Sequence, residues 1–337
     1  TGIIARGFDP IGVIKVRSFL CHGNTQAKSA MKRKPTLAIN RATGDHSTMT
    51  RTLFCFGYGY TAQALARQLL PKGWRVFGTT RRAENLDRLG ASGATVLLWP
   101  AGDITKALHA ASHLLISASP DAQGDPVLQA LGDEITQIAP NLTWAGYLST
   151  TGVYGDTGGD WVSEDTPINP STQRGQRRKA AEQAWRAIPN LPLHIFRLAG
   201  IYGPGRGPFA KLRAGTARRI IKPGQMFSRI HVDDIAQVLA ASMDRPNPAA
   251  IYNVCDDMPA PPQDVISYAA SLLDMPPPPE VPFEQAEMSP MARSFYAESK
   301  RIKNDRIKSE LGVELMYKDY KSVLTAMLKS ERADSTD

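Results

Sequence analysis

One glycine-rich turn constrains the fold of this chain more than any other part of its sequence. The turn follows the apolar strand pattern of residues 53–56 and leads into a helical pattern. Its small residues are Gly57, Gly59 and Ala62, a spacing that permits a tight turn, a close backbone approach to a ligand and close packing of the helix on the strand. We therefore expect the amides around Tyr60, at the positive end of the helix, to bind a pyrophosphate.

The tip of the next strand indicates which dinucleotide this turn binds. A second strand pattern covers residues 74–79, and the resulting βαβ unit has the usual length of about 30 residues. An acidic residue at this tip would bind the 2′-hydroxyl of NAD, but the chain has Arg81 and Arg82 there. Because guanidinium groups bind a 2′-phosphate, we expect NADP as the cofactor, with NAD less favoured. Alternatively, both arginines merely begin a solvated helix.

The positive charge of the chain is concentrated at its beginning. The formal net charge is +8, yet residues 1–51 alone hold nine Lys and Arg against two Asp and Glu. The remainder is nearly neutral, which argues against nucleic acid as a partner. We interpret residues 1–50 as a basic extension without stable structure. The favoured explanation is an upstream coding extension before a natural start at Met49; a transit peptide and a disordered basic arm are the alternatives.

Cysteine usage and hydropathy point to a reducing, aqueous setting. Cys21, Cys55 and Cys255 form no CxxC pair and no metal-binding spacing, so we expect Cys55 and Cys255 to be buried packing residues. No apolar run reaches 18 residues, which predicts that no segment spans a membrane. The sequence is therefore expected to belong to a cytoplasmic protein.

Strand and helix patterns alternate through the first 200 residues. Further strands are predicted at residues 95–98, 113–117, 143–149 and 193–198, and helices at 61–70, 104–110, 127–138 and 173–188. This alternation predicts an α/β fold, a doubly wound parallel Rossmann sheet with helices on both faces. We expect a dinucleotide-binding domain over residues 51–200. Residues 201–330, rich in Pro and Gly, are expected to add the remaining strands and a small C-terminal substrate lobe.

Several short motifs occur in a characteristic order. They are the glycine turn, Ser-Ala-Ser-Pro at 117–120, the Thr-Thr-Gly-Val-Tyr-Gly of 150–155, residues 197–205, the His-Val-Asp-Asp of 231–234, and residues 299–302 followed by 310–312. In this order the chain resembles extended short-chain dehydrogenases/reductases of the NAD-dependent epimerase/dehydratase superfamily, and more narrowly their atypical YeeZ-like bacterial subgroup. The resemblance covers about residues 52 to 328.

The resemblance implies three catalytic side chains. A Ser or Thr after the fifth strand binds the substrate oxygen, a Tyr transfers the proton, and a Lys four residues later binds the nicotinamide ribose. Thr150 matches the first. If Gly175 and Glu182 are aligned with the family pattern, Arg174 takes the place of the Tyr and Arg178 that of the Lys. Arginine stays protonated in proteins, so it cannot replace the Tyr as proton donor.

Three interpretations of the missing tyrosine remain open. In the first, another group donates the proton: Tyr154, Tyr202 or a water held by Thr150. In the second, the protein binds NADP without turnover, as a redox sensor or scaffold. In the third, which is compatible with the first, Arg174 and Arg178 bind a small anionic substrate that is a carbonyl compound or resembles a nucleotide sugar. Both arginines could instead belong to a solvated helix face.

Other polar residues are predicted to be structural. We expect His231 to be a satisfied core histidine, and Asp233 or Asp234 to cap a helix or lie in its first turn. The acidic loop of residues 156–165 is expected to be solvated, without a metal. The resemblance allows a homodimer. The predicted cofactor-binding residues are Gly57, Gly59, Tyr60, Ala62, Arg81, Arg82, Ser117, Ala118 and Leu198; the candidate catalytic residues are Thr150, Tyr154, Arg174 and Arg178.

Overall fold

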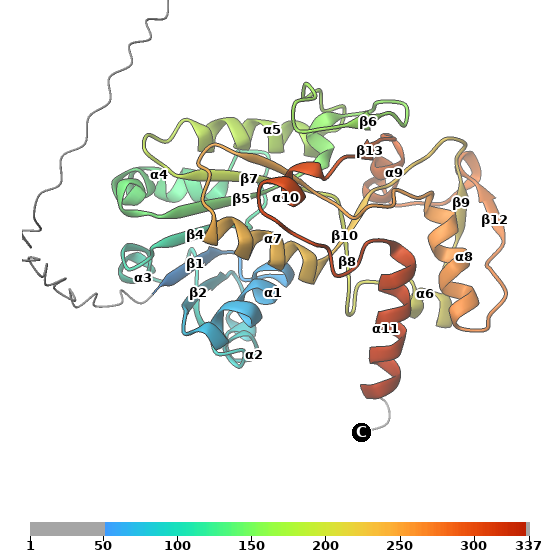
Figure 1. The fold of residues 1–337 in the computed structure, drawn as a ribbon, viewed down its shortest axis with the longest axis horizontal. Coiled ribbons are helices and arrows are strands. Elements are labelled where there is room, and N and C mark those ends of the chain that lie inside the picture. The colour runs from blue at the N-terminus through green and yellow to red at the C-terminus, as the bar shows by residue number, and fades with distance from the viewer. Residues whose placement is uncertain (1–50, 335–337) are drawn as a thin grey trace, which may run out of the picture. The chain divides into compact units, whose positions relative to one another are not determined.

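A seven-stranded parallel sheet forms the centre of the protein (Figure 1). The computed structural model describes residues 51–334, so the predicted basic extension and Cys21 lie outside the described residues. The strand order is β11-β7-β5-β4-β1-β2-β3. The strands are β1 (Thr52–Phe56), β2 (Arg75–Thr80), β3 (Thr95–Leu98), β4 (His113–Ile116), β5 (Trp144–Thr150), β7 (Leu193–Leu198) and β11 (Ile251–Val254). The order reverses beside β1, which confirms the predicted doubly wound Rossmann sheet.

Helices cover both faces of this sheet (Figure 1). Because strand side chains alternate, Leu53 and Cys55 of β1 belong to one apolar cluster, whereas Phe54 and Phe56 belong to the other. The first cluster packs under α1 (Tyr60–Leu69), α2 (Leu86–Gly90) and α7 (Val232–Asp244). The second packs under α3 (Thr105–His109), α4 (Pro126–Ile138) and α5 (Gln173–Arg186). The near-continuous apolar strands predicted this two-sided burial.

Element boundaries differ from the prediction by one or two residues where pairing extends a strand. Thr80 pairs with Leu98 of β3, so β2 reaches Thr80. Thr150 pairs with Leu198 of β7, so β5 includes the candidate catalytic threonine. Hydrophobic patterning could not locate these ends, because both residues are paired through the backbone.

The chain after β7 supplies β11 and builds a smaller lobe. Its short strands pair as β8 (Gly200–Tyr202) with β10 (Arg229–His231) and β9 (Arg219–Ile221) with β12 (Glu280–Pro282), while β13 (Arg301–Ile302) pairs with β6 (Trp161–Val162), which precedes β7. The helices are α6 (Phe209–Arg213), α8 (Pro262–Leu272), α9 (Pro290–Tyr296), α10 (Asp305–Ser309) and α11 (Tyr320–Asp334). A third apolar cluster joins α6, α8 and α11, so the lobe has a core of its own.

Short 3-10 turns connect several elements: η1 (Leu70–Lys72), η2 (Ala83–Asn85), η3 (Ala139–Asn141), η4 (Thr151–Tyr154) and η5 (Phe283–Gln285). None of the helices within residues 51–334 combines the length and apolar character needed to cross a membrane. Cys55 and Cys255 are fully buried, as predicted, and burial raises the pKa of both thiols. Both are therefore packing residues rather than nucleophiles.

Candidate functional site

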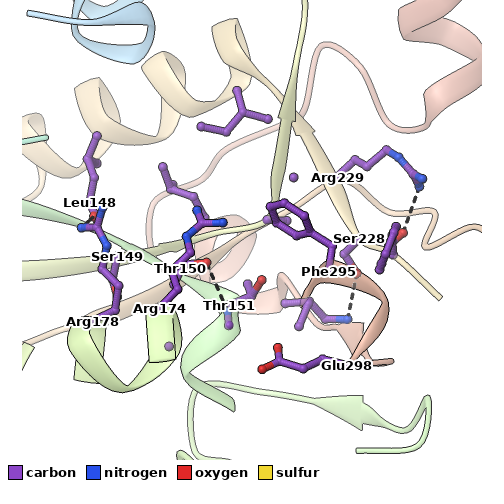
Figure 2. A pocket seen from close by; sticks show the side chains of 18 of the residues that line it. Leu148, Ser149, Thr150, Thr151, Arg174, Arg178, Ser228, Arg229, Phe295 and Glu298 are labelled. Atoms are coloured by element: carbon purple, nitrogen blue, oxygen red, sulfur yellow. Dashed lines mark hydrogen bonds between the residues drawn. The ribbon is translucent and has the colours of Figure 1, made fainter. Parts of the chain in front are cut away.

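A cavity of about 930 Å³ lies beyond the carboxyl ends of β4, β5 and β7. The sheet and α1 contribute Tyr60, Thr61, Ser117, Ser119, residues 148–152 and Leu198, and α5 contributes Arg174, Gly175 and Arg178. Later segments add residues 199–201, Arg206, Lys211, residues 226–229, Ser294, Phe295, Glu298, Lys300 and Ile302 (Figure 2). Ligands of open α/β sheets bind at this edge, and the cavity is shared with the lobe.

The glycine turn has the geometry that a pyrophosphate requires. Gly57 adopts φ +86°, and a Cβ there would lie 3.3 Å from the backbone nitrogen of Ala118. A side chain at Gly57 is therefore disfavoured twice, by the positive φ and by the close contact with the backbone of Ala118. A Cβ on Gly59 would meet nothing within 4 Å, and no side chain caps α1, whose first residue is Tyr60. The open space before uncapped helix amides fits the phosphates of a dinucleotide.

The surroundings of this turn hold it against the neighbouring strands. Thr79 of β2 accepts a hydrogen bond from the amide of Gly57 at 2.9 Å. Ala62 is fully buried, which lets α1 pack on the sheet. Tyr60 reaches the lobe instead: its hydroxyl donates to the carbonyl of Pro204 at 2.9 Å, and the guanidinium of Arg206 lies 5.0 Å from its ring centre. Tyr60 thus links the helix start to the lobe.

Arg81 and Arg82 follow β2 at the same edge of the sheet as the glycine turn. Both are exposed, and within residues 51–334 neither guanidinium has a hydrogen-bond or ion-pair partner. They lie outside the lining of the cavity. An exposed guanidinium without a protein partner is free to bind an anion from solution.

Arg178 is a buried cation held by neutral groups. Its guanidinium donates to the carbonyl of Leu148 at 2.6 Å, to the hydroxyl of Ser119 at 2.9 Å and to that of Tyr147 at 3.1 Å. No ion pair of Arg178 is found within the described part of the chain, although only 8% of the residue is exposed. The position aligned with the family's lysine therefore carries a fixed positive charge on the cavity wall, not a solvated helix face.

Arg174 lies one helical turn before Arg178, in the first turn of α5. Its guanidinium is 5.3 Å from the ring centre of Phe295 in α9, a cation–π contact across the cavity (Figure 2). Desolvation and the charge of Arg178 lower the pKa of Arg174, whereas the carboxylate of Glu298 raises it. These neighbours place two guanidiniums and one carboxylate close to the end of β5.

The structure brings Thr150 into the cavity but not Tyr154 or Tyr202. The Thr150 hydroxyl accepts from the amide of Gly152 at 3.2 Å and lies where β5 ends. Tyr154 is buried, donates to Asn253 at 2.7 Å and accepts from Arg197 at 3.0 Å. Tyr202 is also buried, and donates to Asp256 at 2.7 Å. Neither phenol faces the space beside Thr150, because each is used in a buried polar network.

Of the other residues predicted from the sequence, some line the cavity and others have a structural role. Ser117 and Leu198 line the cavity, whereas the backbone of Ala118 closes against Gly57. His231 is buried and caps α7 by accepting from the amide of Asp233, which confirms its structural interpretation. Both following aspartates lie in the first turn of α7, as expected.

The acidic loop after β5 is only partly solvated, contrary to the prediction: Asp156, Asp160 and Asp165 are exposed, but Glu164 is buried because it binds the backbone of β11. Asp156 accepts from the amides of Ser299 and Gly158, and Glu164 accepts from that of Asn253. No group of three metal-ligating side chains is found among the described residues. The carboxylates of this loop thus fasten the segment around Ser299 to the sheet.

Sequence reasoning missed the cavity residues that come from the end of the chain. Glu298 and Lys300 form a buried ion pair of 2.6 Å, with 9% and 10% of their side chains exposed. Ser228, Arg229 and Phe295 also line the cavity. Lys300 belongs to the motif of residues 299–302 and Glu298 directly precedes it, but nothing in their spacing shows that they meet β5.

Comparison with known proteins gives one curated relative in two strains of the same species. No family model matches the chain. Protein YeeZ of Escherichia coli K12 is 30% identical over 276 residues, which cover 78% of this chain and 95% of YeeZ. A functionally unknown conserved protein from Silicibacter pomeroyi has a solved structure with 60% identity and a TM-score of 0.81, covering 83% of this chain and 99% of that one.

More distant solved structures share the fold. Human epimerase family protein SDR39U1, solved with NADPH, is 16% identical with a TM-score of 0.65, covering 82% of this chain and 99% of that one. The dTDP-glucose 4,6-dehydratase of Bacillus anthracis, solved with NAD, is 15% identical with a TM-score of 0.67, covering 84% and 98%. At these identities the likeness establishes the architecture, and the two structures hold different dinucleotides.

Proposed function

This chain belongs to the family of YeeZ. From that premise and from the fold that it shares with epimerases and dehydratases, we propose that it is an NADP-dependent enzyme of the oxidoreductase or epimerase/dehydratase type. The proposed substrate is a small anionic carbonyl compound or a compound resembling a nucleotide sugar. One observation carries the proposal: a single cavity joins the uncapped start of α1, the hydroxyl of Thr150 and the guanidiniums of Arg174 and Arg178.

The residues for the cofactor lie along one edge of the sheet. Amides at the uncapped start of α1, from Tyr60 onward, would hold the pyrophosphate, because the amides of Gly57 and Gly59 already donate within the protein and the space in front of Gly59 is open. Arg81 and Arg82 would bind the 2′-phosphate, which distinguishes NADP from NAD. The nicotinamide, when bound, supplies or accepts a hydride. NADP is our proposal for this chain, because distant structures of the same fold hold either dinucleotide.

The cavity walls supply the substrate contacts. Thr150 would hydrogen-bond the reacting oxygen at the end of β5. Arg178 is already anchored by three protein acceptors, so it offers a preorganised positive charge rather than a flexible one. Arg174 would bind the anionic part of the substrate, with Phe295 packed against its other side. The surplus of cations over carboxylates in the lining favours an anionic substrate.

A non-catalytic NADP-binding sensor or scaffold is the second candidate. The observation that favours it concerns the two tyrosines considered as proton donors: Tyr154 and Tyr202 lie outside the cavity lining, and both are hydrogen-bonded in the protein interior. In that case NADP binding would change the contact between Tyr60 and the lobe without any hydride transfer.

A spectrophotometric screen separates the two functions. The purified protein is incubated with NADPH and a panel of nucleotide sugars, keto acids and phosphorylated carbonyl compounds, and absorbance loss of NADPH is followed. An enzyme is expected to show steady, concentration-dependent turnover with at least one anionic compound, and Arg174→Ala should raise KM for it. Because an epimerase or dehydratase regenerates its dinucleotide, the same compounds are also incubated with NADP+ and their products are examined by NMR. NADPH binding with neither NADPH loss nor a new product would favour the sensor.

A further inference from the structure

The ion pair of Glu298 and Lys300 lies in the cavity that also contains Thr150, near the turn after β5. Lys300 Nζ is 2.6 Å from Glu298 Oε2, and both side chains line the cavity. A Cβ on Gly152, in the turn after β5, would be 4.0 Å from Glu298 Oε2. Figure 2 shows the carboxylate of Glu298 directed toward this turn, beside Thr151. The pair therefore neighbours the place where Thr150 would hold the reacting oxygen.

Few other groups of the cavity can release a proton. Its arginines stay charged in proteins, so they bind anions but do not transfer protons. Tyr60 is committed to the carbonyl of Pro204 at the start of α1. Lys211, on α6, is exposed to solvent. Lys300 is the remaining cationic side chain of the lining that has protons to give and is also buried.

The position of Lys300 is fixed by several contacts. Glu298 accepts from Lys300 through one carboxylate oxygen and from the hydroxyl of Ser171 through the other, at 2.8 Å. Ser299 donates to the carbonyl of Gly224 and accepts from the amide of Met226. The two residues before the lysine are thus held to the segment that leads into α5 and to the lobe. A buried lysine held at one point is preorganised for a single hydrogen-bond target.

We propose that Lys300 is the proton donor that replaces the family's tyrosine, and that Glu298 positions it. The proposal rests on the proposed function. In carbonyl reduction the carbonyl carbon gains the hydride of a dihydronicotinamide, and the oxygen must gain a proton. An N–H bond of Lys300 breaks, an O–H bond forms on the substrate, and the amine takes its proton back from water. In the reverse direction the neutral amine accepts the hydroxyl proton.

Three variants of the full chain test this assignment with the best compound of the NADPH panel. Lys300→Arg keeps the charge beside Glu298 but gives up no proton, so kcat should fall about 100- to 10,000-fold while KM changes by less than about threefold. The kcat of Lys300→Ala should fall by a similar factor. Added ethylamine should restore part of this kcat in proportion to the amine concentration. Lys303→Met is the matched control, because Lys303 is exposed on the same segment; it should retain wild-type kcat.

Binding and stability are measured beside activity. NADPH affinity by calorimetry and the melting temperature should be nearly unchanged in Lys300→Arg, which shows that the fold and the cofactor site persist. If wild type turns over a compound and Lys300→Arg keeps more than about a third of kcat, only this inference is overturned. Loss of activity without rescue by amine also overturns it, since a structural role would have that result. If wild type binds NADPH but turns over nothing, the proposed enzyme and its donor are both overturned.

Discussion

Replacing Asp256 with asparagine is expected to remove a large part of the pH dependence of stability. Asp256, after β11, is 1% exposed and accepts hydrogen bonds from the hydroxyl of Tyr202 and the amide of Met258. Burial raises the pKa of Asp256 from 3.8 to about 7, and these hydrogen bonds and Arg229 only partly oppose the shift. Burial and the charge of Asp256 in turn raise the pKa of Tyr202, which keeps that phenol protonated.

The direction and size of the effect follow from proton binding. Between pH 5 and 7 the folded protein keeps a proton on Asp256, whereas the unfolded chain has lost it. The unfolded state therefore binds fewer protons, and stability falls as pH rises through this range. Over two pH units this difference lowers the unfolding free energy of the wild-type protein by about 3 kcal/mol. The asparagine variant has no carboxyl group at this position and should not show this loss. Asp234, with a pKa raised by burial to about 6, contributes in the same direction in both proteins and cancels from the comparison.

The assay is urea unfolding of wild type and Asp256→Asn at pH 5 and at pH 8. The difference in unfolding free energy, wild type minus variant, should fall by about 3 kcal/mol between the two pH values. Asp274→Asn, at an exposed position after α8, controls for the change in net charge. A difference that stays constant between pH 5 and pH 8 would refute the assignment of a buried, protonated Asp256.

The other predictions concern the cavity and its edge. Gly57→Ala should reduce stability by about 1–3 kcal/mol in urea unfolding and weaken NADPH binding, because φ is +86° and the backbone of Ala118 is 3.3 Å from the new Cβ; wild-type affinity would contradict this. Thr150→Ala should lower kcat about 10- to 1,000-fold on the panel substrate, with NADPH affinity kept; unchanged kcat would exclude Thr150 from the reacting oxygen. Arg178→Met should destabilise the protein by about 1–3 kcal/mol, because it deprives the carbonyl of Leu148 of its donor; equal melting temperatures would show that water replaces the guanidinium.

Local sequence signals predicted the sheet because each signal is carried by neighbouring residues. The glycine turn, the apolar strands and their spacing suffice for a parallel sheet with two covered faces. Gly57 illustrates the link: its need for a positive φ is a property of one residue, and the structure places it against Ala118. Element ends were less predictable, since backbone pairing carries β5 as far as Thr150.

The chemistry of the cavity was harder to predict because its residues are remote in sequence. Glu298 and Lys300 follow β5 by about 150 residues in the sequence, yet they line the same cavity as the end of β5. The hydrogen bond from the amide of Ser299 to Asp156 holds their segment there. Tyr154 shows the opposite case. Its place in the motif after β5 made it a candidate, but in the structure its hydroxyl is hydrogen-bonded to Asn253 and Arg197. Only three-dimensional packing decides which polar residue of a motif faces a ligand.

Isothermal titration of NADPH and NADH into the wild-type protein and into Arg81→Asp tests the central claim most directly. Arg88→Asp, an exposed change of the same charge on α2, is the control. We predict that wild type binds NADPH more tightly than NADH by about tenfold or more, and that only Arg81→Asp loses this preference. Absence of heat with both dinucleotides in the wild-type protein would contradict a cofactor site at the glycine turn, and equal affinity for both would contradict the role of the arginines.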